Sequence, residues 1–101
     1  MNSQSDVTHA GEWIPDLDED MLVKLKRRIQ EYIECYYTDN PEYNRAIRMK
    51  ENHTKRVAAE TLDIAATLGL SREKCYLAES IALLHDIGRF EQYRQYTTYK
   101  D

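Results

Sequence analysis

The sequence predicts an all-α fold, a helical bundle, and three observations support this prediction. Apolar residues recur at intervals of three and four along most of the chain, which is the spacing of one face of an α-helix. Only three glycines and two prolines occur in 101 residues, so turns are few and helices are long. No segment shows the alternation of apolar and polar residues that is typical of a strand.

The first helix is predicted over residues 15–37. Pro15 and Asp16 provide its start, and the acidic residues at positions 18–20 suit the positive end of the helix dipole. Residues 38–41, TDNP, end it, because Asp and Asn favour turns and the residue before a proline avoids the helical region. Its apolar face is expected to consist of Leu17, Met21, Leu22, Leu25, Ile29, Ile33 and Tyr36.

Two further helices are predicted on either side of Gly69. The first runs from Glu42 to Leu68, and Gly69 is placed to end it, since glycine readily adopts the left-handed conformation at a helix C-terminus. The second runs from Arg72 to Leu84, with Ser71 as its N-cap. The expected apolar faces comprise Tyr43, Ala46, Ile47, Val57, Ala58, Leu62, Ala65 and Leu68 on the first, and Ala78, Ile81 and Ala82 together with His85 on the second.

The two ends of the chain lack a helical pattern. Residues 1–14 are polar and aperiodic, so we expect a flexible tail there, followed by one helical domain over residues 15–101. After Gly88, the segment RFEQYRQYTTYKD shows no apolar face and is expected to form a helical turn and a loop. Gly88 itself is expected to end the helix that precedes it.

Composition excludes several classes of function. The net charge of −4 disfavours non-specific nucleic-acid binding, which needs surplus Lys and Arg, so no nucleic-acid partner is expected. No apolar run approaches the roughly 20 residues of a membrane span, and the first residues lack the features of a secretory signal. These features predict a cytoplasmic protein. Cys35 and Cys75 form no CxxC pair and are expected to be free, partly buried thiols.

Residues 83–90, LLHDIGRF, place His85 and Asp86 side by side at the end of an apolar run. A helical hairpin around Gly69 would bring His53 to this pair, because short connections usually join antiparallel helices. His53 lies 16 residues before Gly69 and His85 lies 16 residues after it, so each is about 24 Å from the turn. The three side chains are therefore expected to meet at one level of the bundle.

Two imidazoles and one carboxylate form a donor set that suits divalent Zn, Mn, Fe or Co. Adjacent His85 and Asp86 can reach one ion only if the helix ends there, since consecutive residues of a continuing helix point about 100° apart. Taken singly, His53 would be a hydrogen-bonded core residue, and the His–Asp pair a helix C-terminus with a turn-forming aspartate. Together, at mirrored positions around one turn, they predict a metal site. His9, in the tail, is given no role.

The segments NHTKRV (52–57) and ALLHDIGRF (82–90) resemble the HD-domain superfamily of metal-dependent phosphohydrolases, whose signature is H…HD…D. The resemblance covers about residues 40–101, with the two motifs in the family's order. It implies a bundle of the HD-domain type in which His53, His85 and Asp86 are metal ligands. Asp86 would also be catalytic, by bridging two metals or by orienting the attacking water.

The resemblance further implies phosphate-binding residues and a reaction. Arg89 follows the HD pair, Arg56 follows His53 by three positions, and Lys50 is a further candidate contact to substrate phosphate. The implied activity is hydrolysis of a nucleotide or another small phosphoester by a metal-activated water. The implied cofactor is a divalent metal, namely Mn, Fe, Co, Zn or Mg.

The chain departs from the family signature in its last ligand. The family's final aspartate lies on a later helix, whereas Asp101 stands too near the HD pair to take that role. Glu51 and Glu91 are considered as substitutes for this ligand. The domain is therefore expected to be truncated at its C-terminus, with bare bundle faces that favour a homodimer. The alternative hypothesis is a non-catalytic helical module for ligand binding or self-association, with a vestigial and incomplete HD site.

Overall fold

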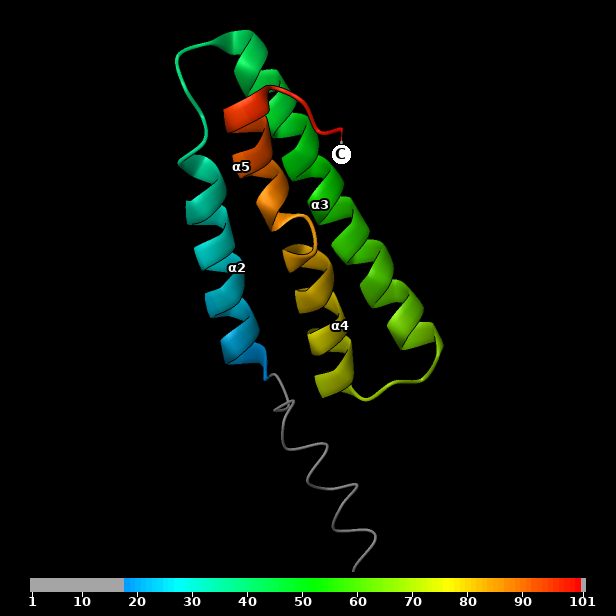
Figure 1. The fold of residues 1–101 in the computed structure, drawn as a ribbon. Coiled ribbons are helices and arrows are strands. Elements are labelled where there is room, and N and C mark those ends of the chain that lie inside the picture. Colours follow the sequence, from blue (N-terminus) through cyan, green and yellow to red (C-terminus); the bar gives the residue numbers. More distant parts are fainter. Residues whose placement is uncertain (1–17, 101) are drawn as a thin grey trace, which may run out of the picture.

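The computed structural model describes residues 18–100, which form an all-α bundle as predicted (Figure 1). Its helices are α2 (Glu19–Glu34), α3 (Pro41–Thr67), α4 (Arg72–Leu84) and α5 (Ile87–Tyr96), and residues 18–100 contain no strand. The long helix α3 packs antiparallel to α4, and α5 continues from the end of α4 along the other half of α3. Helix α2 lies against α4. None of these helices combines the length and apolarity needed to cross a membrane.

The α3–α4 hairpin forms where the sequence predicts it, with boundaries within one residue. Asn40 caps α3 by accepting hydrogen bonds from the backbone N–H groups of Glu42 and Tyr43. Gly69 follows the end of α3 with φ +78°, the left-handed conformation that glycine adopts without strain. Ser71 then caps α4 by accepting from the N–H of Lys74. Both predicted caps of the hairpin are therefore confirmed.

The first predicted helix is correct in its centre and wrong at its end. Helix α2 stops at Glu34, three residues before the predicted end, because the N–H of Tyr36 bonds to the carbonyl of Ile33 and closes a tighter turn. At the other end, Asp18 is the N-cap and its Oδ1 accepts from the N–H of Met21 at 2.8 Å. The predicted start at Pro15 and Asp16, and the predicted tail over residues 1–14, lie outside the described residues.

The segment after His85 corrects two predictions. Residues predicted to form a turn and a loop form helix α5, which Phe90 anchors with no exposed surface at all. Tyr93 of the same helix packs on Tyr43, with ring centroids 5.4 Å apart. Gly88 does not end the preceding helix, because α4 already ends at Leu84 with His85 as its C-cap. Gly88 lies in the first turn of α5 instead.

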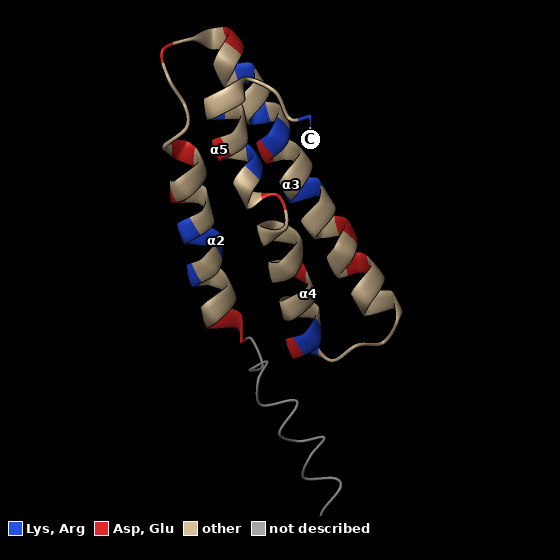
Figure 2. Ribbon diagram, viewed as in Figure 1, with Lys and Arg blue, Asp and Glu red and all other residues tan. Residues whose placement is uncertain are grey.

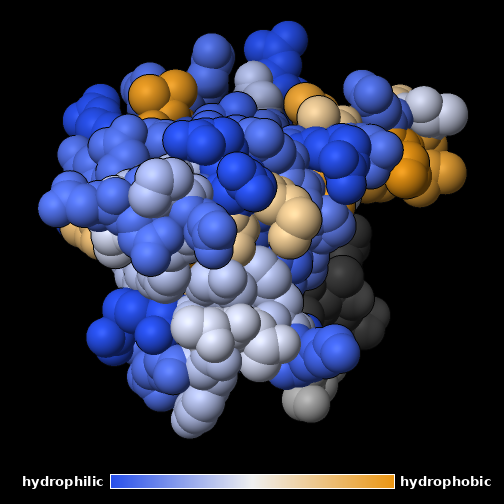
Figure 3. Space-filling model, turned by 90° about the horizontal axis from the view of Figure 1, so that it is seen from above, coloured by the Kyte–Doolittle hydropathy of each residue, from blue (hydrophilic) through white to orange (hydrophobic). Residues whose placement is uncertain are grey.

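The core lies between α2 and the α3–α4–α5 layer, and its largest fully buried apolar side chains are Phe90, Ile33 and Ile47. Three apolar residues predicted on buried faces are exposed, Met21 by 43%, Leu68 by 71% and Ile81 by 59%. The end of the bundle seen in Figure 3 is mostly hydrophilic, with apolar groups at its periphery. The cysteines are free thiols as predicted, but the predicted partial burial is wrong for Cys35, which is exposed, while Cys75 is buried. The fold thus leaves part of its apolar surface uncovered near the α3–α4 hairpin.

Replacing Gly69 by alanine is expected to lower the free energy of unfolding by about 1–2 kcal/mol, because a Cβ is strained in the left-handed conformation. Gly88→Ala is the matched control, since no heavy atom lies within 4 Å of the position its Cβ would take. Inside a helix this change is expected to stabilise the fold by about 0.5–1 kcal/mol. Urea unfolding followed by circular dichroism measures both. Effects of the same sign would contradict the assigned turn and helix.

Candidate metal centre

His53, His85 and Asp86 meet where α4 ends and α5 begins, against the middle of α3. His85 is the C-cap of α4 and Asp86 the N-cap of α5, so neither belongs to a continuing helix. Each of the three offers one ligand atom, and these atoms lie within 4.8 Å of one another. Figure 2 shows the acidic loop between α4 and α5 next to basic segments of α3. The structure therefore brings together the three side chains that the sequence places at mirrored positions around Gly69.

The separations between these atoms match the spacing of ligands around a small metal ion. Asp86 Oδ2 lies 3.2 Å from His85 Nε2 and 3.5 Å from His53 Nε2. Ligands held about 2.0–2.1 Å from a tetrahedral ion stand about 3.3 Å apart. Imidazole nitrogen with carboxylate oxygen is also a donor set that Zn²⁺ and similar ions accept. Two of the three separations and the donor chemistry therefore suit a divalent ion, and the third separation, between the histidines, is within 4.8 Å.

His85 is held in an orientation that suits coordination. Its Nδ1 contacts the backbone carbonyl of Ala82, which can only accept, so Nδ1 carries a proton. Nε2 faces the Asp86 carboxylate 3.2 Å away, so a protonated ring donates a hydrogen bond to the carboxylate and a neutral ring directs a lone pair at it. A proton on Nε2 or a metal ion between the two groups satisfies this contact. The backbone carbonyl is the kind of outer partner that metal-ligating histidines commonly have.

His53 is held differently, because Arg56 contacts its second nitrogen. The Arg56 guanidinium lies 3.2 Å from His53 Nδ1 and can only donate, so Nδ1 accepts and the proton of the neutral ring lies on Nε2. That proton faces Asp86. Coordination through His53 Nε2 therefore requires Arg56 to release Nδ1 and the proton to move there. Arg56 opposes the metal-binding form of His53 in this arrangement.

The other predicted cations also surround the Asp86 carboxylate. Lys50 Nζ lies 3.9 Å from Asp86 Oδ2, and Arg89 Nε lies 3.7 Å from Asp86 Oδ1. Lys50, His53 and Arg56, with Met49, line a hollow of about 270 Å³ beside the site. The Asp86 side chain is only 13% exposed, whereas those of His53 and His85 are 38% and 42% exposed. The site is thus a mostly buried carboxylate under a cationic, solvent-open rim.

Sequence reasoning missed the contribution of Tyr99, which it treated with the other tyrosines as packing. Lys50 Nζ stands 4.8 Å above the centre of the Tyr99 ring, and Arg89 donates to the Tyr99 backbone carbonyl. The ring stacks on Tyr93, and its hydroxyl donates to the carbonyl of Ala46 at 2.8 Å. Burial raises the pKa of this hydroxyl, so it stays protonated and bound. In the sequence, only the position of Tyr99 after the HD pair could have suggested that it contacts the cations of the site.

The two glutamates considered as a further ligand are engaged elsewhere. Glu51 accepts hydrogen bonds from Gln30, Tyr37 and Lys55. Burial raises the pKa of its carboxyl, but these hydrogen bonds outweigh burial and the net pKa is lowered. Glu91 accepts from Tyr36, Arg94 and Gln95, and these bonds, that from Arg94 first, lower its pKa to about 2. Asp101 lies outside residues 18–100, which supply no fourth member to the cluster.

Comparison of the chain with models of known protein families, with curated proteins and with solved structures finds no match. The geometry of the site therefore stands on the described residues alone.

Removal of one ligand is expected to weaken metal binding by more than about 100-fold, since even outer partners of ligands are worth 10- to 100-fold. The substitutions are His85→Ala and Asp86→Asn, with His9→Ala as the control at the remaining histidine of the chain. Calorimetric titration with Zn²⁺ and Mn²⁺ measures the affinity, and the visible absorption of added Co²⁺ reports the ligand set. Unchanged affinity in either variant would remove the site from consideration.

Replacing Arg56 by methionine is expected to strengthen metal binding by up to about tenfold. The change removes a nearby positive charge and frees His53 Nδ1 to carry the proton. Arg45→Met on the same helix is the matched control, because Arg45 is exposed and no contact with the site is described for it. The same titration measures both variants. Weaker binding in Arg56→Met alone would show that Arg56 supports the site instead.

Proposed function

We propose that this chain is a metal-dependent phosphohydrolase domain of the HD type, with His53, His85 and Asp86 as ligands of a divalent ion such as Mn, Fe, Co, Zn or Mg. The observation that carries the proposal is the contact between His85 Nε2 and Asp86 Oδ2. The carbonyl of Ala82 accepts from Nδ1, so the neutral ring directs the lone pair of Nε2 at the carboxylate, an arrangement suited to holding a cation between the two groups. His53 approaches the same oxygen from α3.

The chain's own residues prepare the site for reaction in three ways. The α4–α5 junction fixes His85 and Asp86 on separate helix ends, so that both face α3. Asp86 has a second oxygen, Oδ1, that can accept a hydrogen bond from the attacking water and orient it. The bound ion supplies Lewis acidity toward water and phosphoryl oxygens. Asp86 therefore serves both as a ligand and as the catalytic carboxylate in this proposal.

The charge around the site favours an anionic substrate. Lys50 and Arg89 flank the Asp86 carboxylate and Arg56 contacts His53 beside it, although the whole chain carries a net charge of −4. Once an ion neutralises Asp86, these cations are left to bind the oxygens of another anion, and arginine matches phosphate in a bidentate manner. The substrate class is therefore a small phosphorylated molecule, a nucleotide or another phosphoester. The free thiols of Cys35 and Cys75 support a cytoplasmic location.

The alternative function is a non-catalytic helical module for ligand binding or self-association with a vestigial, incomplete HD site. An apolar groove of about 350 Å³ next to the trio favours it. Val57, Ile81 and Ala82 line this groove together with His85, and Ile81 is 59% exposed. Exposed apolar surface of this kind commonly marks an interaction site, here between two copies of the chain.

Hydrolysis of phosphoesters by the metal-loaded chain tests the proposal. A panel of nucleotides and a chromogenic phosphodiester, each with Mn²⁺, Fe²⁺, Co²⁺, Zn²⁺ or Mg²⁺, is expected to give turnover with at least one metal. Asp86→Asn should lower kcat by at least about 10²- to 10³-fold, because it removes a ligand and the orienting carboxylate together. Arg89→Gln should instead raise KM, by about tenfold, with a smaller change in kcat.

The control is Arg72→Gln, which removes an exposed cation at the far end of α4 and is expected to leave both kinetic constants unchanged. Sedimentation of the chain with and without Ile81→Glu measures self-association in parallel. Stoichiometric metal without turnover on any substrate, together with dimers that Ile81→Glu dissociates, would favour the non-catalytic module.

A further inference from the structure

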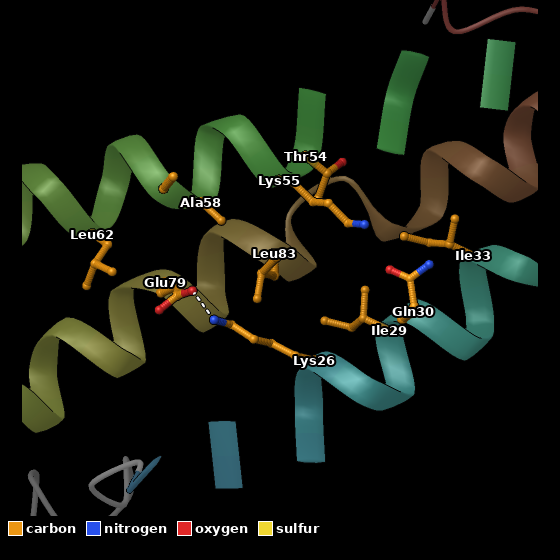
Figure 4. A pocket seen from close by; sticks show the side chains of 11 residues that line it. Lys26, Ile29, Gln30, Ile33, Thr54, Lys55, Ala58, Leu62, Glu79 and Leu83 are labelled. Atoms are coloured by element: carbon orange, nitrogen blue, oxygen red, sulfur yellow. Dashed lines mark ion pairs between the residues drawn. The ribbon is translucent and has the colours of Figure 1, made fainter. Parts of the chain in front are cut away.

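A second pocket lies between α2, α3 and α4, and it shares no residue with the metal trio. Its volume is about 390 Å³, within the range of small-molecule sites. Figure 4 shows side chains from all three helices converging on it. Its apolar wall consists of Ile29, Ile33, Ala58, Ala59, Leu62 and Leu83. A pocket lined in this way is suited to an apolar molecule.

The charged groups of this pocket are already paired with each other. Lys26 Nζ lies 2.6 Å from Glu79 Oε2, the ion pair drawn in Figure 4. Lys55 also lines the pocket, and its Nζ lies 2.8 Å from Oε2 of Glu51, a residue outside the lining. An anionic ligand would gain little from neutralised lysines and would lie against Glu79, whose side chain is only 9% exposed. A cationic ligand would have to displace Lys26. An uncharged ligand is therefore favoured.

Two of the polar atoms left over at the pocket are acceptors. Glu79 binds Lys26 through Oε2, and among residues 18–100 its Oε1 has no described partner. The Gln30 amide N–H groups donate to Glu34 and Glu51, which leaves its amide oxygen, turned toward the other lining side chains in Figure 4. The free oxygens of Glu79 and Gln30 can each accept a hydrogen bond from a ligand. The ligand therefore needs an N–H or O–H group.

Thr54 is a further polar side chain of the pocket, and its hydroxyl lacks a partner. Three other helical hydroxyls, those of Thr61, Thr67 and Ser80, donate to the carbonyl four residues earlier. Thr54 lines the pocket and is 1% exposed, yet its hydroxyl has no partner among the described residues. Buried hydroxyls normally have one. The oxygen is buried as it stands, so it reaches a molecule in the pocket only after a change of χ1.

We propose that this pocket binds a small, uncharged, mainly apolar molecule that carries an N–H or O–H donor, held by apolar contacts and by donation to Glu79 Oε1. This function is separate from that of the metal centre. It requires neither the metal nor the proposed phosphohydrolase activity.

Indole and 1-methylindole are matched probes, because only indole carries the donor. Each is titrated into the full chain while ¹³C-methyl spectra follow the methyl groups of Ile29, Ile33, Leu62 and Leu83. Indole is expected to shift these signals and to bind about tenfold more tightly than 1-methylindole, the difference made by one hydrogen bond to a charged acceptor. Absence of shifts with indole, or equal affinities for the two probes, would overturn the proposal.

Two variants locate the binding. Ala59→Phe is expected to fill the mouth of the pocket and to reduce indole affinity at least tenfold, whereas Ala66→Phe, exposed on the same helix outside the pocket, should leave it unchanged. Glu79→Gln keeps the side-chain shape and should reduce the preference for indole over 1-methylindole, because a neutral amide oxygen accepts a weaker hydrogen bond than a carboxylate. An unchanged preference in Glu79→Gln, or equal effects of the two phenylalanines, would exclude the pocket as the binding site.

Discussion

The register of the α3–α4 hairpin is the constraint on which the rest of the structure depends. Gly69 sets the turn in the left-handed conformation, and Ser71 restarts the helix two residues later. This short connection leaves no freedom for α4 to slide along α3. The register set at the turn determines which residues of α3 and α4 face each other along the rest of the hairpin, including His53 and His85. The same register fixes where α4 ends, and so where α5 can begin to pack on the upper half of α3.

Much of this arrangement can be predicted from the sequence because local signals and long-range geometry agree. The two helices of the hairpin have clearly periodic apolar residues and recognisable caps. Given the turn at Gly69, the helical rise per residue then places His53 and His85 at the same level of the bundle. Helix α5 could not be predicted because it has one fully buried residue, Phe90, and no continuous apolar face. Its stability comes from contacts across 40 or more positions, such as Tyr93 with Tyr43. The sequence pattern of the ten residues of α5 does not reveal these long-range contacts.

The details of the site depend on side-chain rotamers, which the sequence does not determine. Spacing places Arg56 one turn after His53, but only the structure shows that its guanidinium contacts Nδ1 instead of pointing to solvent. The role of Tyr99 likewise depends on the chain folding back after α5, so that its ring lies under Lys50. Both contacts change the chemistry of the trio. One sets the tautomer of His53, and the other fixes a cation beside the carboxylate.

Asp86 is the N-cap of α5, yet its carboxylate makes no capping hydrogen bond. An aspartate at this position normally stabilises its helix by about 1 kcal/mol through such a bond. Here the side chain turns toward the histidines, so the start of α5 lacks its usual stabilisation. Any ion that Asp86 holds together with α3 residues therefore also clamps the first turn of α5. Occupancy of the site and docking of this helix are consequently linked equilibria, and each strengthens the other by the same free energy.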